Sequence, residues 1–373
     1  MHDLSDPAVH RRVRMLTAGG ADVQLAGFRR TATIPREIAA CKVVDLGQTR
    51  DGALLARIGS VASAGLNLHR LEQMVRDSDV VLARNLEMLY VAAKARRRYA
   101  PSASLAYECL DIHRLLLGES LPSRLLRVME KRLMSDVDLI LTSSPRFVSE
   151  YFDPRGFDRP VTILENKVFL LDSKIDRQMS PPGGPPWRIG WFGMIRCRRS
   201  FEILSEATRA LNGLLEVKIA GRPSPQEFPD FEAQVAANPY LSFSGPYRFD
   251  DLPKLYGDVH FSWAADFFEQ GLNSAWLLPN RVYESSFFGA IPIAIEGVET
   301  ASWLQRRGIG TILDGDPATS LGEFIRHLTE ARYRTLGAAL RNVPTPDLAA
   351  TPQSCGELLK SFESLRGLAQ AGV

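Results

Sequence analysis

The chain has 373 residues, enough for about two ordinary domains of roughly 100–200 residues each. Hydrophobic residues make up 45% of the chain and charged residues 24%, a balance that excludes wholesale disorder and a coiled-coil rod. The formal net charge of +2 excludes a dedicated nucleic-acid coat, and we expect no nucleic-acid partner. The first 180 residues carry 27 basic and 22 acidic side chains, so the amino-terminal half is mildly basic.

The four cysteines are scattered along the chain without a Cys-x-x-Cys pair, which indicates neither a zinc site nor a disulfide framework. No apolar stretch approaches the roughly 18 residues that would span a bilayer. The first residues also lack the basic and then apolar plan of a secretory signal. We therefore expect a cytoplasmic protein.

Short runs rich in Val, Ile and Leu alternate with longer amphipathic stretches, a pattern typical of βαβ units in a parallel sheet. A first series predicts strands at 23–27, 42–45, 79–83, 104–107, 138–142 and 161–164. Helices are expected at 7–17, 53–76, 88–99, 123–134 and 145–152. The helix at Pro7 would normally follow a strand, yet only a few residues precede it. We therefore expect the first strand of the amino-terminal sheet to be missing, and a late-annotated start codon is the preferred explanation.

A segment rich in proline and glycine, 180–187, separates this series from a second one. Its four prolines lack backbone donors, so it cannot form a regular helix or a central strand. The second series predicts strands at 188–192, 215–220, 241–244, 260–263, 291–294 and 311–313. Its helices are expected at 200–211, 250–255, 280–288, 300–306 and 321–328, and a last amphipathic stretch covers 355–368.

These patterns predict an α/β protein in which two Rossmann-like domains face a central cleft. The expected parts are an amino-terminal domain over 1–172, a linker over 173–187, a carboxyl-terminal domain over 188–350 and a terminal helix over 351–373. Ligands of open α/β sheets bind beyond the carboxyl ends of the strands, so we look for functional residues there.

Glycines and arginines gather where the first strand of the second domain ends. Gly190 and Gly193 flank that end, and glycine lets backbone donors approach an anionic ligand, although a tight turn would use glycine equally well. Arg196, Arg198 and Arg199 follow immediately before a helix whose amino terminus favours negative charge. Together they suit a diphosphate, with Arg196 and Arg199 as the preferred ligands; the alternative is a solvated basic loop.

A carboxylate stands one turn into a later helix, in the stretch Pro279-Asn-Arg-Val-Tyr-Glu284. A carboxylate in this place can accept two hydroxyl hydrogen bonds from a ribose. The alternative is an exposed glutamate that stabilises the helix dipole.

The order of these motifs resembles the nucleotide-sugar domain of GT-B glycosyltransferases, specifically the retaining enzymes of family 4. It comprises the glycine-rich strand end, the basic residues, Ile219-Ala-Gly221, the Pro279 to Glu284 stretch and Gly289-Ala-Ile-Pro292. The resemblance spans nearly the whole chain. The stretches from His2 to Val13 and from Tyr107 to His113 resemble more narrowly the bacterial exopolysaccharide glycosyltransferases of the succinoglycan type.

The resemblance implies that the second domain binds the donor and that the first faces the acceptor, with the last helix crossing back onto the first domain. Glu284 would bind the donor ribose, and Arg199, at the family's lysine position, would bind the diphosphate with support from Arg196. The remaining donor-site residues that we carry over or infer are Gly190, Gly193, Gly221, Asn273, Asn280 and Arg281.

This sequence departs from the family in two places. The family often has a second glutamate eight positions before Glu284, where this chain has Trp276; Asp266 and Glu269 could substitute only if their loop bends inward. Relatives also commonly read Tyr-Asp/Glu-x-His-Asp, where this chain has Leu110 before Asp111 and a histidine, His113, two positions beyond.

Glu108, Asp111 and His113 form a polar cluster at a predicted strand end of the first domain. One of them, with Asp111 preferred, would accept the proton of the acceptor hydroxyl; surface or capping roles are the alternative. In the resembling family, retaining transfer needs no protein nucleophile, so stabilisation of the leaving diphosphate supplies most of the catalysis. None of the motifs that carry the resemblance contains Asp-x-Asp, so we predict metal-independent chemistry without a cofactor.

The leading hypothesis is a transferase that moves a sugar from a nucleotide diphosphate sugar, a UDP-sugar or else a GDP-sugar, with retention at the anomeric carbon. Its acceptor would be a polyprenyl-diphosphate-linked or other saccharide in exopolysaccharide biosynthesis. Arginine clusters at 11–14, 29–30 and 96–98 suit peripheral contact with the anionic inner face of the cytoplasmic membrane. The alternatives are a GT-B sugar-nucleotide epimerase and a non-catalytic GT-B scaffold.

Overall fold

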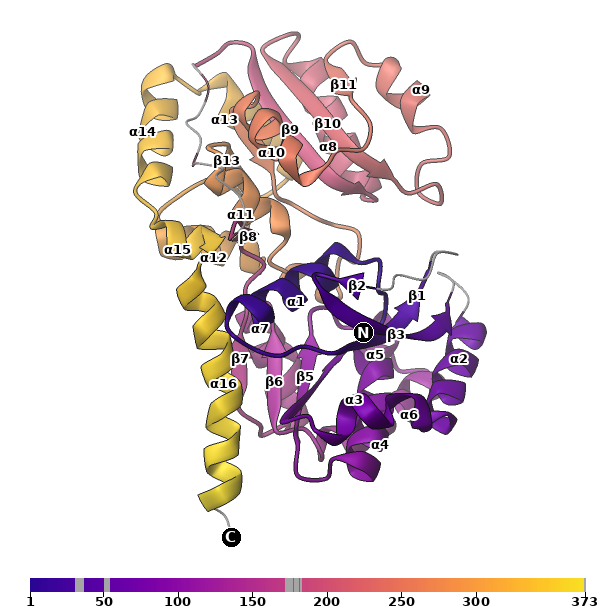
Figure 1. Cartoon of the computed structure of the whole chain (residues 1–373). Helices are drawn as coiled ribbons and strands as arrows, with labels where there is room; N and C mark the ends of the chain where they lie inside the picture. The colour runs from indigo at the N-terminus through magenta and orange to yellow at the C-terminus, as the bar shows by residue number, and fades with distance from the viewer. Residues whose placement is uncertain (31–36, 50–53, 172–176, 178–180, 182, 372–373) are drawn as a thin grey trace. The chain divides into compact units, whose positions relative to one another are not determined.

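The chain divides into two α/β units in the computed structural model, which describes residues 1–30, 37–49, 54–171, 177, 181 and 183–371 (Figure 1). Unit 1 consists of Met1–Glu165 together with Thr351–Val373, and unit 2 consists of Asn166–Ala350. Much of the predicted linker, namely 173–176, 178–180 and 182, lies outside the described residues. The first long strand after it begins at Trp187.

The strands of unit 1 form two sheets rather than one. The smaller sheet has the order β1-β3-β2, with β1 (Leu25–Arg29) parallel to β3 (Cys41–Gln48) and β2 (Glu37–Ile38) antiparallel to β3. The larger sheet is parallel, with strands in the order β4 (Val80–Arg84), β5 (Ser104–Cys109), β6 (Leu139–Thr142) and β7 (Val161–Ile163). All six residues of β5 are buried, as expected for a strand covered on both faces.

A cavity of about 520 Å³ lies between the two sheets of unit 1 and is lined on one side by residues 20–26 and on the other by residues 77–83. The edge strands β1 and β4 both contribute to its walls. Met1 also lines the cavity. The Met1 carbonyl accepts from the Phe28 amide at 3.1 Å, and the Leu4 amide donates to the Phe28 carbonyl at 2.7 Å.

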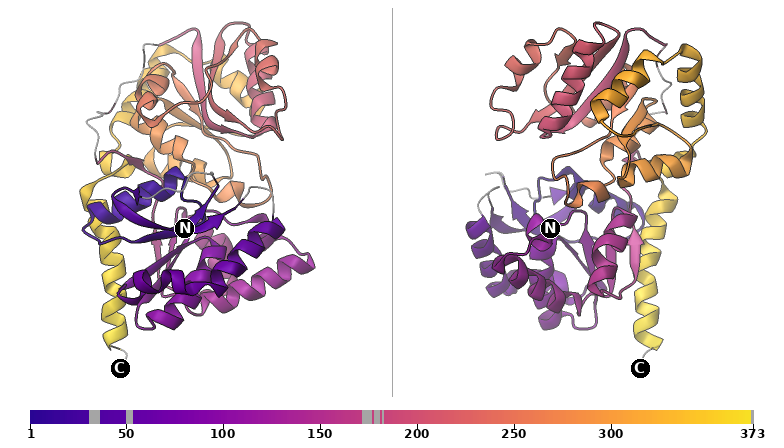
Figure 2. Two further views of the ribbon diagram at one scale, coloured as in Figure 1. Left: turned by 45° about the vertical axis from the view of Figure 1, so that its right-hand side comes forward. Right: turned by 180° about the vertical axis from the view of Figure 1, so that it is seen from behind.

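The helices of unit 1 are α1 (Pro7–Ala18), α2 (Leu54–Leu66), α3 (Glu72–Arg76), α4 (Leu86–Tyr99), α5 (Arg114–Leu117), α6 (Leu121–Met134), α7 (Pro145–Phe147) and α16 (Pro352–Ala371). The carboxyl-terminal α16 packs against α1 and contacts β5, and Figures 1 and 2 show it, in yellow, alongside the strands of unit 1.

Two helix predictions in unit 1 are wrong. The expected helix over 53–76, whose first residue lies outside the described residues, is interrupted after Leu66. The Asn67 side chain there donates to the Ser63 carbonyl at 3.0 Å, an interaction that competes with continuation of the helix. The expected helix over 145–152 is a short α-helical turn followed by a π-helical turn from Val148 to Phe152.

Unit 2 contains a six-stranded parallel sheet in the order β11-β10-β9-β12-β13-β14. Its strands are β9 (Trp187–Ile195), β10 (Leu215–Pro223), β11 (Leu241–Phe243), β12 (Phe261–Trp263), β13 (Ile291–Ile295) and β14 (Thr311–Leu313). A separate pair joins β8 (Val168–Phe169) to β15 (Ala349–Ala350).

The helices of unit 2 are α8 (Arg198–Ala210), α9 (Phe231–Ala236), α10 (Leu252–Gly257), α11 (Asn280–Phe287), α12 (Glu299–Arg307), α13 (Pro317–Arg326), α14 (Glu330–Arg341) and α15 (Thr345–Leu348). The sequence prediction missed α9, α14 and α15.

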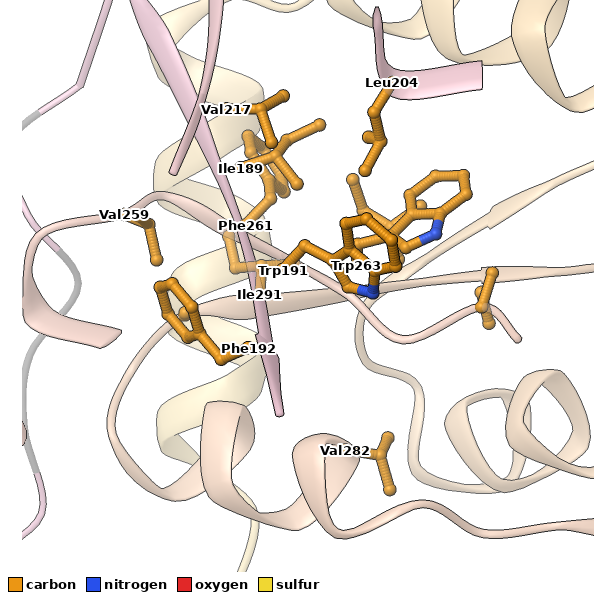
Figure 3. Packing of buried hydrophobic residues seen from close by; sticks show 14 of the residues in the cluster. Ile189, Trp191, Phe192, Leu204, Val217, Val259, Phe261, Trp263, Val282 and Ile291 are labelled. Carbon is orange, nitrogen blue, oxygen red and sulfur yellow. The ribbon is translucent and has the colours of Figure 1, made fainter. Parts of the chain in front are cut away.

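The core of unit 2 is built from the continuous apolar runs of its central strands. Phe261 is in register with Ile189 on one neighbouring strand and with Ile291 on the other, and all three side chains are fully buried. Figure 3 shows these residues lying together in the cluster. Strands with both faces covered pair in parallel and read as near-continuous hydrophobic runs, which is why the sequence pattern located them. This sheet fixes where the carboxyl ends of β9, β10 and β12 lie.

Candidate functional site

Two glycines face each other where β9 and β10 end. Gly221 is in register with Gly193, and both have positive φ angles, +139° and +120°. A Cβ on Gly221 would lie 1.7 Å from the Gly193 carbonyl oxygen, so the two strands can approach only without a side chain there. A Cβ on Gly193 would meet only the Tyr247 hydroxyl at 4.0 Å, which leaves the Gly193 backbone open on that side.

Gly190 has a different environment from these two. A Cβ at this position in β9 would lie 2.6 Å from the Phe192 ring and 3.1 Å from Val259. The structure therefore gives Gly190 a packing role within the sheet.

The basic run after β9 begins α8, whose first turn is held by a buried cysteine. The Cys197 sulfur accepts from the Ser200 amide at 3.4 Å and from the Phe267 amide at 3.3 Å, which ties the helix start to the segment after β12. Arg199 donates to the Gln270 side chain at 2.7 Å. Arg198 instead donates to the Glu227 carbonyl and stacks over the Phe228 ring. Arg196 and Arg199 therefore turn toward the segment after β12, and Arg198 turns away from it.

Asp266 brings this basic run and α11 together. Its Oδ2 atom lies 3.7 Å from Nη2 of Arg196 and 4.0 Å from Nη2 of Arg281. Its Oδ1 atom accepts from the Phe268 amide at 2.9 Å, which closes a local turn. Asp266 therefore lies at the edge of the arginine cluster, and its replacement of the carboxylate missing at Trp276 stays a prediction.

Glu284 lies one turn into α11, three residues after Arg281, and is half-buried. Its Oε2 atom accepts a hydrogen bond from the Tyr256 hydroxyl at 3.2 Å. Burial and the nearby Glu284 charge raise the pKa of Tyr256 and of Tyr247, so both phenols stay protonated as donors. Sequence reasoning missed these two tyrosines, because they come from α10 and the loop before it.

The two asparagines assigned to donor binding have opposite environments. Asn280 is exposed at the first position of α11, next to the charged cluster. Asn273 is fully buried in a short 3₁₀ turn from Asn273 to Trp276.

The polar residues predicted at the end of β5 in unit 1 separate into buried and exposed groups. Glu108 is fully buried, and its two oxygens accept from Nε of Arg12 at 2.7 Å and from Nε of Arg84 at 2.8 Å. These arginines hold the pKa of Glu108 at about 2 despite burial, which acts in the opposite direction. Asp111 and His113 are exposed in the loop that follows, and Nδ1 of His113 accepts from the Leu115 amide at 3.3 Å to cap α5.

Several arginines of the clusters predicted to contact lipid form ion pairs within unit 1, and the lipid contact stays a prediction. Arg12 is buried against Glu108, as described above. The partners of the others are Asp45 for Arg29, Asp3 for Arg30, Asp138 for Arg96 and Asp136 for Arg97. These guanidinium groups are neutralised locally rather than presented as a bare basic surface.

Two searches of the described part of the chain gave negative results. Within it, no helix is both long and apolar enough to cross a membrane. No group of three or more His, Cys, Asp or Glu side chains there is arranged to hold a metal ion.

Comparison with known proteins identifies a relative and a fold. No protein-family model matches the chain. The chain is 48% identical over 338 residues to the succinoglycan biosynthesis protein ExoL of Rhizobium meliloti, covering 89% of this chain and 84% of the relative.

Solved structures that resemble the chain are GT-B glycosyltransferases of low sequence identity. Anabaena HepE in complex with UDP and glucose superposes with a TM-score of 0.67 at 13% identity, covering 97% of each chain. Sucrose-phosphate synthase of Thermosynechococcus elongatus gives a TM-score of 0.71 at 12% identity, covering 98% of this chain and 95% of the other. WaaG, a glycosyltransferase of lipopolysaccharide biosynthesis, gives 0.59 at 10% identity, covering 96% and 98%. The chain therefore has the GT-B fold and belongs to the family of succinoglycan biosynthesis proteins that ExoL represents.

Proposed function

We propose that this chain transfers a sugar from a UDP-sugar, or alternatively a GDP-sugar, to a lipid-linked or other saccharide acceptor in exopolysaccharide biosynthesis. The observation that carries the proposal is the charged cluster of Arg196, Asp266, Arg281 and Glu284 at the carboxyl edge of the unit 2 sheet, beside the open backbone of Gly193. The name of the relative, a succinoglycan biosynthesis protein, supports the pathway. The complexes of HepE with UDP and with UDP-glucose support a uridine nucleotide.

In this proposal Glu284 accepts hydrogen bonds from the two ribose hydroxyls. A carboxylate has several lone-pair directions, so the bond from Tyr256 to Oε2 leaves acceptor capacity on the group. That bond also fixes the rotamer of Glu284. The exposed Asn280 and the half-buried Arg281 lie on the same turn, where they would contact the sugar nucleotide.

The diphosphate would bind at the amino terminus of α8, between Arg196 and Arg199. Backbone amides at a helix start carry partial positive charge, and guanidinium groups bind phosphate oxygens in a bidentate way. Charge that develops on the leaving diphosphate is stabilised by the same groups, which need little rearrangement as the glycosidic bond breaks. We propose no metal requirement on this basis, and we propose retention at the anomeric carbon because the motifs resemble those of the retaining enzymes of family 4.

In unit 1, we propose Asp111 as the group that accepts the acceptor proton, with His113 as the second candidate. Both are exposed at the end of β5. Glu108 is a positioning residue in this proposal, because a buried carboxylate with both oxygens bound to guanidinium groups has a pKa too low for an effective base at neutral pH.

The experiment is calorimetric titration of UDP, GDP and ADP into the full chain, with and without magnesium. It is repeated on Glu284→Ala and Arg199→Ala, with Glu330→Ala and Arg326→Ala as controls. Glu330 is an exposed glutamate in the first turn of α14, and Arg326 is an exposed helical arginine on α13. Loss of hydrogen bonds to a charged group predicts binding weakened roughly 10- to 100-fold in the test variants alone.

Three results would contradict the proposal. Equal binding of UDP by Glu284→Ala and by wild type would remove the ribose assignment. Absence of binding to any of the three nucleotides would favour a non-catalytic scaffold. Release of free nucleotide diphosphate at a full catalytic rate without an acceptor would instead favour an epimerase.

A further inference from the structure

A single turn of helix, α5, stands between β5 and α6, directly after the two exposed residues proposed for the acceptor side. It has four residues, and a helix of this length is not stable without contacts from outside. Asp111 and His113 precede it and are exposed, whereas Ile112 and Leu116 are buried. The positions of Asp111 and His113 therefore depend on what holds α5 in place.

Two arginines hold the carboxyl end of α5. Nη2 of Arg155 donates to the Leu116 carbonyl at 3.3 Å. Nη1 of Arg127 donates to the same carbonyl at 3.4 Å and also to the Gly118 carbonyl. Carbonyls at the end of a helix lack partners within the helix, and cations stabilise this end of the helix dipole. The two guanidinium groups come from α6 and from the 3₁₀ turn Asp153–Arg155, so three segments of unit 1 meet at one carbonyl.

A buried carboxylate and a tyrosine hold Arg155 on its other side. The Tyr151 hydroxyl donates to the two oxygens of Glu130 at 2.9 and 2.7 Å, and both residues are buried. The guanidinium carbon of Arg155 lies 3.7 Å from the centre of the Tyr151 ring. An aromatic face attracts a cation, and the hydrogen bond from the phenol to Glu130 polarises the ring in the same direction. Glu130, Tyr151 and Arg155 thus form a chain of contacts that ends at α5.

The charges of both arginines act on Glu130. Burial raises the pKa of Glu130 to about 7, and the charges of Arg155 and Arg127 act in the opposite direction. Nε of Arg155 is buried and has no hydrogen-bond partner in the part of the chain that the structure describes. A buried donor without a partner is unfavourable, so the contacts of Arg155 with the ring and with the Leu116 carbonyl must compensate for it. Arg155 is therefore held in one place rather than free in solvent.

We propose that Arg127 and Arg155 are positioning residues, which hold α5 and the two exposed residues before it in the arrangement that the reaction uses. At the other end of this loop the Cys109 thiol donates to the Asp111 carbonyl at 3.5 Å, so the loop is fixed on both sides. A displacement of about 1 Å of a reacting group can cost about 100-fold in rate, which is why such anchoring matters. The inference rests on the proposed function for the role of Asp111, whereas the anchoring itself does not depend on turnover.

The test is hydrogen–deuterium exchange of the full chain, followed by mass spectrometry of peptides that cover 110–118. The variants are Arg127→Gln and Arg155→Gln. Arg159→Gln is the matched control, because Arg159 also donates to a carbonyl at a helix end, that of Ser135 after α6, at 3.0 Å. Thermal unfolding and UDP calorimetry follow the stability of the chain and the donor site separately.

We expect 110–118 to exchange about 10- to 100-fold faster in each of the two test variants, as the loss of hydrogen bonds from a charged group predicts. Arg159→Gln should exchange as wild type does in this segment. Diethyl pyrocarbonate should modify His113 faster in the test variants, because Nδ1 of His113 accepts from the Leu115 amide only while α5 is formed. The affinity for UDP should be unchanged in all three variants.

Three results would overturn the anchoring role. The first is wild-type exchange of 110–118 in both test variants. The second is an equal loss of protection throughout unit 1, including the peptide over β6, because the arginines would then stabilise the whole unit rather than this loop. The third is unchanged modification of His113. Failure of the proposed function appears elsewhere, as wild type that binds no UDP or as full sugar transfer by Asp111→Asn, and neither result alters the exchange of the loop.

Discussion

Replacing Glu108 with glutamine should destabilise unit 1 without acting on the chemistry directly. The carboxylate compensates two buried guanidinium groups, and Arg12 and Arg84 lose their counter-ion when it is neutralised. The pKa of Glu108 is lowered from 4.5 to about 2, and each pH unit corresponds to about 1.4 kcal/mol. The charged form is therefore favoured in the folded unit by about 3 kcal/mol, within the range of about 3–5 kcal/mol for breaking a buried ion pair.

The sign of the pH effect follows from the direction of the shift. A carboxyl whose folded pKa is depressed contributes its full stability above its ordinary pKa of 4.5 and loses it as pH falls through about 2. The difference between wild type and Glu108→Gln should therefore be largest at neutral pH and shrink below pH 4.5. For a unit of this size, about 3 kcal/mol corresponds to a melting temperature lower by roughly 10 °C.

Calorimetric melting of both proteins at neutral and at acidic pH measures this difference. Asp111→Asn is the matched control, because Asp111 is an exposed carboxylate just beyond the same strand, and it should melt as wild type does. The reasoning fails if Glu108→Gln melts within about 2 °C of wild type at neutral pH. Unchanged melting together with abolished sugar transfer would return Glu108 to the position of catalytic base.

Three further predictions concern one buried carboxylate and two glycines. Burial raises the pKa of Glu130 to about 7, so the free energy of unfolding of the wild type should fall by about 3 kcal/mol as pH rises from 4.5 through 7. Glu130→Gln should remove this pH dependence. Urea unfolding at pH values on both sides of that range measures it. Gly221→Ala should prevent close pairing of β9 and β10 and give insoluble or strongly destabilised protein, measured by soluble yield and melting temperature, because its Cβ would lie 1.7 Å from the Gly193 carbonyl. Gly193→Ala should cost less stability and weaken UDP binding more, since its Cβ would enter open space beside the proposed site.

The sheets were predictable because their signal is local. Parallel strands buried on both faces are continuous apolar runs, and the prediction of 188–192 falls within the observed Trp187–Ile195. The strand continues past Phe192 because Gly193 pairs with Gly221, an interaction that the apolar pattern does not contain. The expected missing strand was also a local inference, from a capped helix with only a few residues before it, and it stays a prediction.

The side-chain environments depended on long-range pairing and could not be predicted. Glu108 meets Arg12 across 96 residues of chain, so a carboxylate expected at an open strand end is enclosed instead. Tyr256 reaches Glu284 from another helix, and no periodicity in either segment indicates this. The position of Asp266 beside the arginines depends on the conformation of its loop, in which the Phe268 amide donates to Oδ1 of Asp266.

The two carboxylate clusters differ in a way that bears on function. Around Glu108 the contacts are 2.7 and 2.8 Å, all three side chains are almost fully buried, and no change of the cluster is possible without leaving a charge uncompensated. Around Asp266 the nearest guanidinium nitrogens lie at 3.7 and 4.0 Å, and the Arg196 side chain is 40% exposed. Such long and partly solvated pairs contribute little, about 0–1 kcal/mol, so a phosphate can take over Arg196 at small cost. The first cluster is suited to hold a fold in place, whereas the second is suited to exchange one anion for another, as a donor site must when it binds a nucleotide sugar and releases a nucleotide diphosphate.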